Sequence, residues 1–321
     1  MRTWFVRLWV GIALVLSACG TTTPSAAPSA GDELSGTITV SGAFALYPMM
    51  TIWAEEFQKQ HPNVQFDVQG GGAGKGMTDT LAGAVDIGMI SRVIKPEEEA
   101  QGAFWVKVTK DAVYPVISAE NPVAERIIAQ GISQATLAKI YITGEITTWG
   151  QVVGDESITD PINIYTRSDA SGAAEMWAKF GGGKVQDDLK GVGVNSEPAM
   201  VDTVIKDPLG IGYSNLNSVY DPSTGAFVAG ALVPPLDINE NGQADANEYY
   251  ETKSEALQAV ADGIYPSPPA RDEHLATKGK PSGLTLTFIT WILTDGQQYL
   301  APAGYVPLTP DEQQASLEKL K

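Results

Sequence analysis

The amino-acid sequence predicts an α/β protein built from two units, each a mostly parallel sheet flanked by helices. Three features support this prediction. β-branched segments alternate with segments of helical periodicity, the alternation restarts once near residue 113, and small-residue turns follow three of the predicted strands. Strands that alternate with helices form parallel sheets with right-handed crossovers. We detect no internal repeat of fixed period.

The first unit begins with a β-branched strand over 37–40. A helix follows it, because apolar side chains recur there at helical spacing: Leu46, Met49, Met50, Trp53 and Phe57. Alternating apolar residues predict a second strand over 64–68, which leads into a glycine run over 70–76 and a helix over 74–82. A buried strand over 85–90 completes the unit.

The second unit repeats this alternation. A strand over 113–118 precedes a helix over 133–141, and a strand over 162–165 precedes a helix over 171–180. A short strand over 211–213 follows.

The charge balance limits the choice of ligands. With 21 Lys and Arg against 38 Asp and Glu, the formal net charge is −17, which disfavours nucleic acid as a partner and long-range attraction of anions. An anion site must therefore depend on local donors. The loops 41–44, 70–76 and 167–173 each follow a strand and open a helix, and helix N-termini at the carboxyl ends of parallel strands are suited to bind anions.

We expect amides, hydroxyls and guanidinium groups at these strand ends to bind the ligand. Arg167 would present a bidentate fork to a tetrahedral oxyanion, with Asp169 holding it in place. The alternatives are that 41–44 is a plain turn, that Arg167 pairs between domains, and that Arg92 faces solvent or a hinge. The glycine run matches neither a P-loop nor a dinucleotide fingerprint. The candidate ligand-binding residues are Ala43, Phe44, Ser91, Arg92, Arg167, Ser171, Gly172 and Ala173.

The N-terminus predicts export and a lipid anchor. Two arginines precede an apolar run over 8–16, which is shorter than the ~20 residues of a membrane-spanning helix and typical of a secretory signal. Leu16-Ser17-Ala18-Cys19 resembles a bacterial lipobox, in which the cysteine is lipidated. We expect a signal peptide over 1–18 and a lipidated, flexible tether over 19–33. The alternative is an ordinary signal peptide with Cys19, the only cysteine, beside it by chance.

Seven stretches resemble the substrate-binding proteins of phosphate ABC importers, in that family's order: SGAFALYPMM (41–50), VQGGGAGKG (68–76), VDIGMISR (85–92), IYTRSDASGAA (164–174), DPLGIGYSNL (207–216), YPSPPARD (265–272) and FITWILTDGQQYLAPAGYVPL (288–308). The resemblance implies the two-lobed type II periplasmic-binding-protein fold. We expect lobe one to comprise 34–113 and 221–321, and lobe two 114–220. The implied function is capture of inorganic phosphate, or a related tetrahedral oxyanion, between the lobes for delivery to an ABC importer.

The sequence departs from better-known members of this family in four places. Ala43, Ala73 and Ala173 stand where those proteins often carry a hydroxyl, and Ser91 occupies roughly the position of a carboxylate that in some members accepts the proton of hydrogen phosphate. Such an acceptor selects phosphate, because sulfate carries no proton near neutral pH. These replacements change side chains only, so the backbone amides remain available as donors. We expect micromolar or tighter phosphate binding, about −8 kcal/mol or better, and the sequence leaves the identity of the oxyanion open.

The segment 237–248 fits the pattern D-x-[DN]-x-[DN]-G-x5-E and resembles an EF-hand calcium loop. Its ligands would come from Asp237, Asn239, Asn241, Gln243 (through its carbonyl), Asp245 and Glu248. Val233-Pro234-Pro235 cannot form the usual incoming helix, so we expect a lone loop with a weak, structural Ca²⁺. The alternative is an acidic surface turn.

We do not expect an enzyme. The two histidines, His61 and His274, lie in no metal-ligand spacing or nucleophile motif. Two alternatives to transport remain: a cell-surface phosphoester hydrolase, and an anion sensor or calcium-dependent surface module. We expect an extracytoplasmic monomer without a functional cofactor or nucleic-acid partner. Its partners would be the importer permease and, through the lipid anchor, the membrane.

Overall fold

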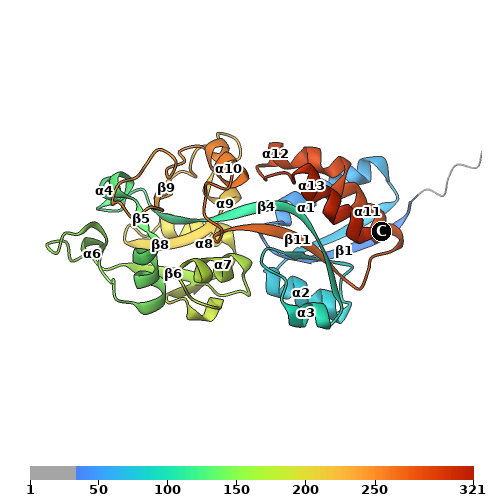
Figure 1. Cartoon of the computed structure of the whole chain (residues 1–321), viewed down its shortest axis with the longest axis horizontal. Helices are drawn as coiled ribbons and strands as arrows, with labels where there is room; N and C mark the ends of the chain where they lie inside the picture. The colour runs from blue at the N-terminus through green and yellow to red at the C-terminus, as the bar shows by residue number, and fades with distance from the viewer. Residues whose placement is uncertain (1–33) are drawn as a thin grey trace, which may run out of the picture. The chain divides into compact units, whose positions relative to one another are not determined.

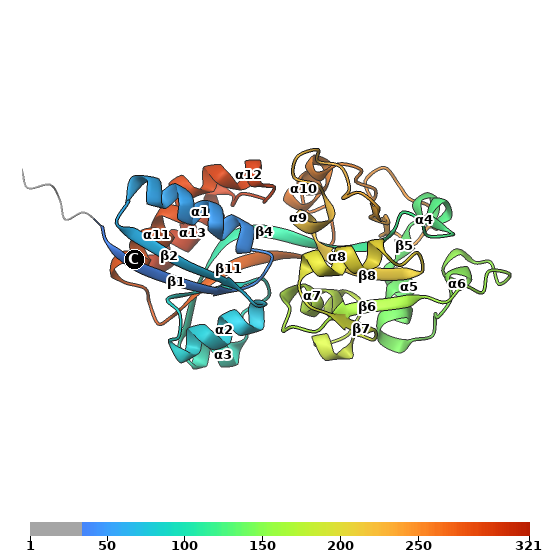
Figure 2. The same cartoon turned by 180° about the vertical axis from the view of Figure 1, so that it is seen from behind.

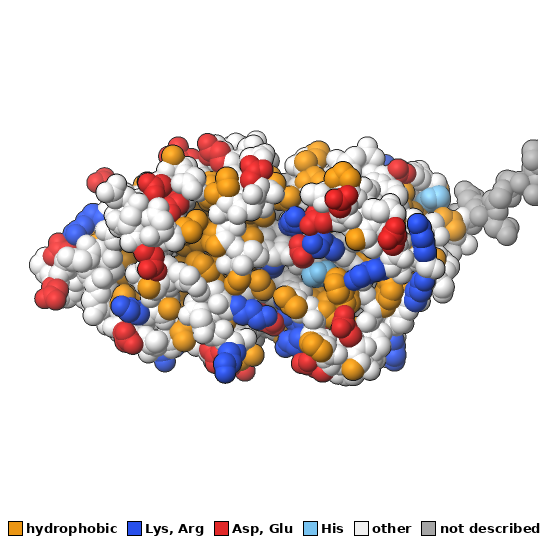
Figure 3. Space-filling view, viewed as in Figure 1, with side chains coloured by type: hydrophobic (Ala, Val, Ile, Leu, Met, Phe, Trp, Pro, Cys, Tyr) orange, Lys and Arg blue, Asp and Glu red, His pale blue; other side chains and the backbone are white. Residues whose placement is uncertain are grey.

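The computed structural model describes residues 34–321. The predicted signal peptide, the lipidation site Cys19 and the tether lie outside the described residues. Among residues 34–321, no helix combines the length and apolar character needed to cross a membrane. Figure 3 shows acidic and basic side chains interspersed over one face of the described chain.

The strands form one large sheet and one small one. The strands of the large sheet are β1 (Gly36–Gly42), β2 (Val64–Gly70), β3 (Ile87–Ile90), β4 (Ala103–Ser118), β6 (Asn163–Arg167), β7 (Val192–Val194), β8 (Gly210–Asn215), β9 (Ala231–Leu232) and β11 (Ala270–Lys278). Their order is β2-β1-β3-β11-β4-β8-β6-β7, with β9 beside β4. β1 pairs in parallel with β2 and β3, and β6 with β7 and β8, whereas β4 and β11 run antiparallel to their neighbours. The small sheet pairs β5 (Ile132–Ser133) with β10 (Leu236–Asp237).

The helices pack around two separate hydrophobic cores, which define two lobes. Lobe one carries α1 (Tyr47–Gln60), α2 (Ala73–Ala82), α3 (Pro96–Ala100), α11 (Gly283–Leu293), α12 (Leu300–Ala303) and α13 (Pro310–Leu320). Lobe two carries α4 (Ala124–Gln130), α5 (Gln134–Ala138), α6 (Trp149–Val153), α7 (Gly172–Phe180), α8 (Glu197–Ile205), α9 (Leu216–Val219) and α10 (Lys253–Ala261). The predicted two-lobed α/β fold is confirmed.

The two long strands β4 and β11 run side by side between the lobes (Figures 1 and 2). Along β4, Val108 belongs to the core of lobe one and Ala112 to that of lobe two. Along β11, Ala270 belongs to lobe two and Leu275 to lobe one. The predicted strand over 113–118 is therefore only the second half of a continuous strand.

The predicted return to lobe one near residue 220 is wrong. Tyr250, Ala256 and Val260 are buried in the core of lobe two. The chain returns only along β11, because the buried apolar side chains between 220 and 270 belong to the core of lobe two and β9 pairs with β4. The segment 221–269 therefore belongs to lobe two.

A buried charge cluster lies where β4 and β11 cross between the lobes. Arg271 donates from Nη2 to Asp111 Oδ2 (3.0 Å) and to Asn215 Oδ1 (2.5 Å). Glu273 is fully buried, with Oε1 3.5 Å from Arg271 Nε. Burial raises the pKa of both Asp111 and Glu273, although Arg271 opposes the shift. At this crossing, carboxylates outnumber guanidinium groups in a space with almost no solvent.

His274, the next residue along β11, is also buried. Its ring packs edge-on against Trp105 with centroids 4.9 Å apart, and 6% of the residue is exposed. Burial lowers the pKa of His274 to about 4, with Asp272 opposing the shift and Lys107 and Lys319 adding to it. As the pH falls below about 6.5, the ring of His274 becomes protonated in the unfolded chain, whereas in the folded chain it becomes protonated only near pH 4. Acid therefore favours unfolding through this residue.

We predict that His274→Phe removes this acid sensitivity. Between pH 7 and pH 4 the wild type should lose roughly 3 kcal/mol of unfolding free energy relative to the variant, from a shift of about 2.5 pKa units. Urea unfolding at pH 7, 5.5 and 4 measures the difference.

A His274→Gln variant, which also carries no titrating ring, separates the charge from the packing of the ring. Both variants should show the same flattened pH dependence even if their stabilities at pH 7 differ. If the unfolding free energy changed with pH in the same way in the wild type and in both variants, His274 would have the same pKa in the folded and unfolded chains.

Candidate functional site

The predicted ligand-binding residues meet where the two lobes touch. Ala43 and Phe44 follow β1, Ser91 and Arg92 follow β3, and the others lie between the end of β6 and the start of α7: Arg167, Ser171, Gly172 and Ala173. Across the interface, Gly74 N donates to Ala170 O at 2.9 Å. A β-carbon added at Gly172 would overlap the hydroxyl and carbonyl oxygens of Ser91. The structure thus brings together residues that are far apart in sequence.

The N-terminus of α7 supplies oriented donors at this interface. Ser171 caps the helix, since its Oγ accepts from Ala174 N at 3.3 Å, and the hydroxyl proton remains available to a ligand. Gly172 and Ala173 form the first turn, where amides have no acceptor within the helix. The partial positive charge of the helix end adds to these donors. This element fits the predicted anion contacts.

The segment that follows β1 contributes differently from the prediction. Ala43 N donates to Met89 O at 2.9 Å, so the pairing of β1 with β3 uses this amide and does not leave it free. The helix α1 begins only at Tyr47. The ring of Phe44 lies 5.7 Å from the guanidinium carbon of Arg167, within the range of a cation–π interaction. Phe44 thus contacts the site through its side chain.

Arg167 is held by two carboxylates and is 3% exposed. Its Nε and Nη2 donate to Asp169 at 2.8 and 2.6 Å, which matches the expected role of Asp169. Its Nη1 lies against Glu197 Oε1. Burial disfavours the charge, but Glu197 and Asp169 outweigh this and raise the pKa of Arg167. Arg167 is a permanent cation whose charge is already balanced.

Glu197 is the site residue that the sequence analysis missed. It is the first residue of α8, it is 4% exposed, and its Oε2 has no hydrogen-bond partner among the described residues. In the sequence, an acidic residue before Pro198 is typical of a helix start, where it complements the helix dipole. No local pattern indicates that Glu197 reaches Arg167, thirty positions earlier in the chain.

Arg92 lies in lobe one and contacts a carboxylate of each lobe. Its guanidinium donates to both oxygens of Glu98, at 2.9 and 2.6 Å, and its Nε lies 3.5 Å from Glu175 Oε2 of α7. Burial opposes the charge, whereas Glu98 and Glu175 raise the pKa of Arg92. Of the alternatives for Arg92, solvent or a hinge, its burial and its contact with Glu175 of the other lobe exclude solvent.

The acidic loop 237–248 lies in lobe two and closes on itself. Asp237 accepts from Gly242 N at 2.9 Å and from Asn241 N at 3.0 Å, and Glu248 accepts from Ile238 N at 2.8 Å and from Asp245 N at 3.0 Å. The amide groups of Asn239 and Asn241 donate to Asp245, and Gln243 N donates to Asn241 Oδ1. Within residues 34–321, no three His, Cys, Asp or Glu side chains converge closely enough to hold a metal ion.

The sequence of this chain is similar to those of known binding proteins. The sequence model of the PBP superfamily domain matches residues 27–296. The phosphate-binding protein PstS of Bacillus subtilis is 28% identical over 94% of this chain and 92% of its own length. PstS of Methanocaldococcus jannaschii is 27% identical over 95% of this chain and 92% of its own length.

Solved structures share the fold. A protein described as a phosphate ABC transporter substrate-binding protein, from Clostridium perfringens and with bound phosphate, aligns with a TM-score of 0.68 at 22% identity, covering 85% of this chain and all of its own. An ABC-type phosphate transport receptor from Vibrio cholerae aligns with a TM-score of 0.62 at 22% identity, covering 84% of this chain and all of its own.

We predict that Gly172→Ala separates the two lobes, because the added methyl group overlaps backbone and side chain of Ser91. The interlobe hydrogen bond from Gly74 N to Ala170 O should then break. Hydrogen exchange at the Gly74 amide, followed by NMR, should speed up by about tenfold or more.

The matched control is Gly181→Ala at the other end of α7, where the nearest atom to the added carbon is Ile142 Cγ1 at 3.3 Å. This variant should keep the Gly74 amide protected. Unchanged protection of Gly74 in Gly172→Ala would show that the contact between Ser91 and Gly172 does not hold the lobes together.

Proposed function

Because the chain belongs to the PBP superfamily, we propose that it captures inorganic phosphate, or a related tetrahedral oxyanion, between its lobes and delivers it to an ABC importer. The observation that carries this proposal is the meeting of the α7 N-terminus, Ser91 and Arg167 at the contact between the lobes. The names of both curated relatives favour phosphate as the ligand and binding, rather than hydrolysis, as the activity.

Phosphate would be bound mainly by neutral donors. The amides of Gly172 and Ala173 and the hydroxyls of Ser91 and Ser171 can each contribute about 0.5–1.5 kcal/mol, and up to ~3 kcal/mol with a charged partner. Arg167 adds a guanidinium whose charge Asp169 and Glu197 balance. A sum near −8 kcal/mol, the free energy of micromolar binding, is within reach of these groups.

Glu197 would provide the proton acceptor that Ser91 cannot. Its Oε2 is buried and unpartnered among the described residues, and its Oε1 lies beside Arg167. A protonated phosphate oxygen can donate to this carboxylate, whereas sulfate has no proton near neutral pH and would be repelled. Glu197 therefore favours phosphate over sulfate.

The proposed location is extracytoplasmic. A lipid on Cys19 would tether the protein to the membrane, and the segment 19–33 would give it reach toward the importer permease. The protein would act as a monomer.

We also propose that the loop 237–248 binds a structural Ca²⁺, which would have to draw Asp237, Asp245 and Glu248 together, because these carboxylates do not converge in the structure. Asp237 and Glu248 are 5% and 3% exposed, at opposite ends of the loop. Gly242 adopts a φ of +74° between them, as the sharp turn of an EF-hand loop requires. With amides in place of two carboxylates, we expect a dissociation constant of roughly 10⁻⁴–10⁻³ M.

We predict that the purified protein binds phosphate at micromolar concentration and prefers it to sulfate. The variant Glu197→Gln should reduce the ratio of the two affinities by about tenfold or more, because the amide no longer carries a charge that repels sulfate. Isothermal titration calorimetry with each anion at pH 7 measures both.

Asp202→Asn is the matched control, since this exposed carboxylate lies on the same helix and pairs with Lys206. It should leave the ratio unchanged. No heat with phosphate, together with binding of another oxyanion, would overturn the phosphate assignment. An unchanged ratio of phosphate to sulfate affinity in Glu197→Gln would show that Glu197 does not discriminate between the two anions.

For the loop, we predict that 10 mM Ca²⁺ raises the stability of the protein by about 1.4–2.7 kcal/mol, as expected for one site with a dissociation constant of roughly 10⁻⁴–10⁻³ M. Glu248→Gln should abolish this increase, whereas Asp262→Asn, an exposed carboxylate at the end of α10, should preserve it. Thermal unfolding with calcium and with chelator measures the difference. Equal melting temperatures in the wild type would identify the segment as a plain acidic turn.

A further inference from the structure

One side chain, that of Gln186, joins both ends of the loop that leads from β6 to α7. Its Oε1 accepts from Ser171 N at 2.8 Å. Its Nε2 donates to Asp169 O at 2.7 Å and to Arg167 O at 3.3 Å. The backbone amide requires an acceptor and the two carbonyl groups require donors, so only this orientation of the Gln186 amide satisfies all three bonds. A single residue outside the loop therefore bridges it.

Gln186 lies on a segment that is itself held in place. It opens a short 3₁₀-helix, η2 (Gln186–Asp188), which follows α7 in the chain. The carboxylate of Asp188 accepts from Lys184 N at 2.6 Å and from Val185 N at 3.1 Å. These bonds fix the turn that carries Gln186, so its side chain reaches the start of α7 from a defined direction.

The bond to Ser171 N bears on the donors that follow it in the chain. Ser171 caps α7 in an extended backbone conformation, with φ −96° and ψ 128°, and its orientation decides where the amides of Gly172 and Ala173 point. Gln186 uses the amide of Ser171 and leaves these two amides and the Ser171 hydroxyl to a ligand. Donors that are held before the ligand arrives lose less freedom on binding, which favours affinity.

Gln186 has no group of its own to offer an anion. Both hydrogens of its side-chain amide are used by the carbonyl oxygens of Asp169 and Arg167, and its Oε1 would repel a negative charge. It nevertheless lines a polar pocket of about 460 Å³, together with Arg92 and Ser171. Gln186 therefore lies beside the proposed site without the means to bind the ligand directly.

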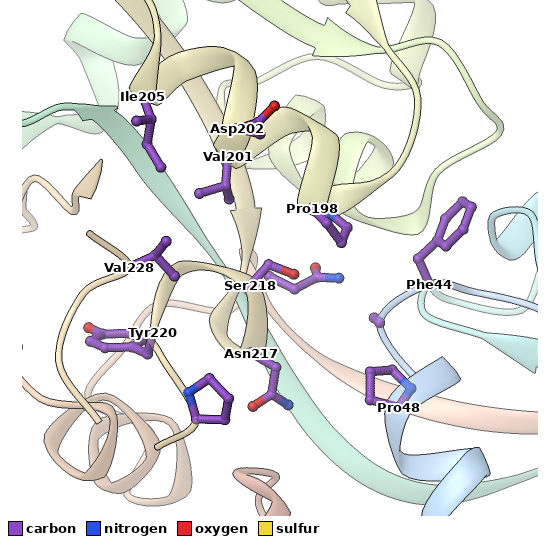
Figure 4. A pocket seen from close by; sticks show the side chains of 13 residues that line it. Phe44, Pro48, Pro198, Val201, Asp202, Ile205, Asn217, Ser218, Tyr220 and Val228 are labelled. Carbon is purple, nitrogen blue, oxygen red and sulfur yellow. The ribbon is translucent and has the colours of Figure 1, made fainter. Parts of the chain in front are cut away.

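A second pocket next to the site is apolar and has a volume of about 380 Å³. Figure 4 shows Phe44 and Pro198 among the residues that line it. Of these two pockets, only the polar one is lined by Ser171, whose hydroxyl is a proposed donor. The start of α7 thus borders the pocket that Gln186 helps to form.

We propose that Gln186 is a positioning residue of the anion site: it holds the loop 167–171 so that the first amides of α7 and the Ser171 hydroxyl face the ligand. This inference rests on the proposed function, because it concerns the same donors. Loss of the Gln186 amide would leave every proposed ligand group in the chain but let their directions vary. Binding should therefore weaken although no contact with the anion is removed.

The variant Gln186→Met tests the proposal, because it nearly keeps the length of the side chain and removes its donors and its acceptor. Isothermal titration calorimetry with inorganic phosphate at pH 7 should show binding weakened by about tenfold or more relative to the wild type. In the phosphate-free protein, hydrogen exchange at the Ser171 amide, followed by NMR, should become faster.

The matched control is Gln134→Met at the other end of α7. Gln134 Nε2 donates to the carbonyl oxygen of Phe180, the last residue of that helix, at 2.5 Å. This variant should keep the wild-type phosphate affinity and the wild-type exchange at Ser171, even where thermal unfolding shows a similar loss of stability. An equal loss of affinity in both variants would overturn the proposal, because lower stability alone would then account for it.

The variant Gln186→Glu examines the donors separately and replaces Gln186→Met if that variant does not fold, as judged by thermal unfolding. At pH 7 the introduced carboxylate can accept from Ser171 N, but it repels the carbonyl oxygens of Arg167 and Asp169, so phosphate should bind more weakly than to the wild type. At pH 5 a protonated carboxyl group can donate again. The ratio of wild-type to variant affinity should therefore be at least about twofold smaller at pH 5 than at pH 7.

Two results would contradict the positioning role and leave the proposed function intact. One is wild-type phosphate affinity in Gln186→Met, and the other is a ratio for Gln186→Glu that does not change with pH. Absence of phosphate binding by the wild type would overturn both proposals.

Discussion

The antiparallel pairing of β4 with β11 is the constraint on which the rest of the structure depends. These two strands are the segments that pass between the hydrophobic cores, and their register fixes how the strand ends of one lobe face those of the other. The pair of Arg271 with Asp111 is buried at the crossing. Removing one partner of such a buried pair is strongly destabilising, by about 3–5 kcal/mol, because it leaves an uncompensated charge. The interface between the lobes therefore depends on this crossing.

The charges at the interface explain how an acidic protein can hold an anion. Arg167 is balanced by Asp169 and Glu197, and Arg92 by Glu98 and Glu175. Neither guanidinium offers a net positive field to an approaching ligand. The remaining attraction comes from the first amides of α7, which face the interface at the carboxyl end of β6. Binding through fixed dipoles is short-ranged, so an anion must lie directly against these amides.

The sequence predicted the alternation of strands and helices well, but two boundaries were wrong. The first half of β4 was missed because Lys107, Lys110 and Asp111 interrupt its apolar pattern as a turn would. In the structure, Lys107 pairs with Asp272 at 2.7 Å and Lys110 with Glu312 at 2.9 Å, so these charges are satisfied by distant segments. The late return to lobe one was missed because the apolar side chains between 220 and 270 indicate burial, not which core they enter.

The sequence by itself determined where the loops of the candidate site lie, because the end of a strand and the start of a helix depend on neighbouring residues. The turn after β6, with Ser171 as helix cap and Asp169 beside Arg167, follows from such local chemistry. Only the tertiary structure decided that Glu197 contacts Arg167, that Glu175 reaches Arg92, and that an apolar pocket opens beside Phe44. Each of these contacts joins segments far apart in the chain, and the packing of the two lobes, not local periodicity, sets their distance.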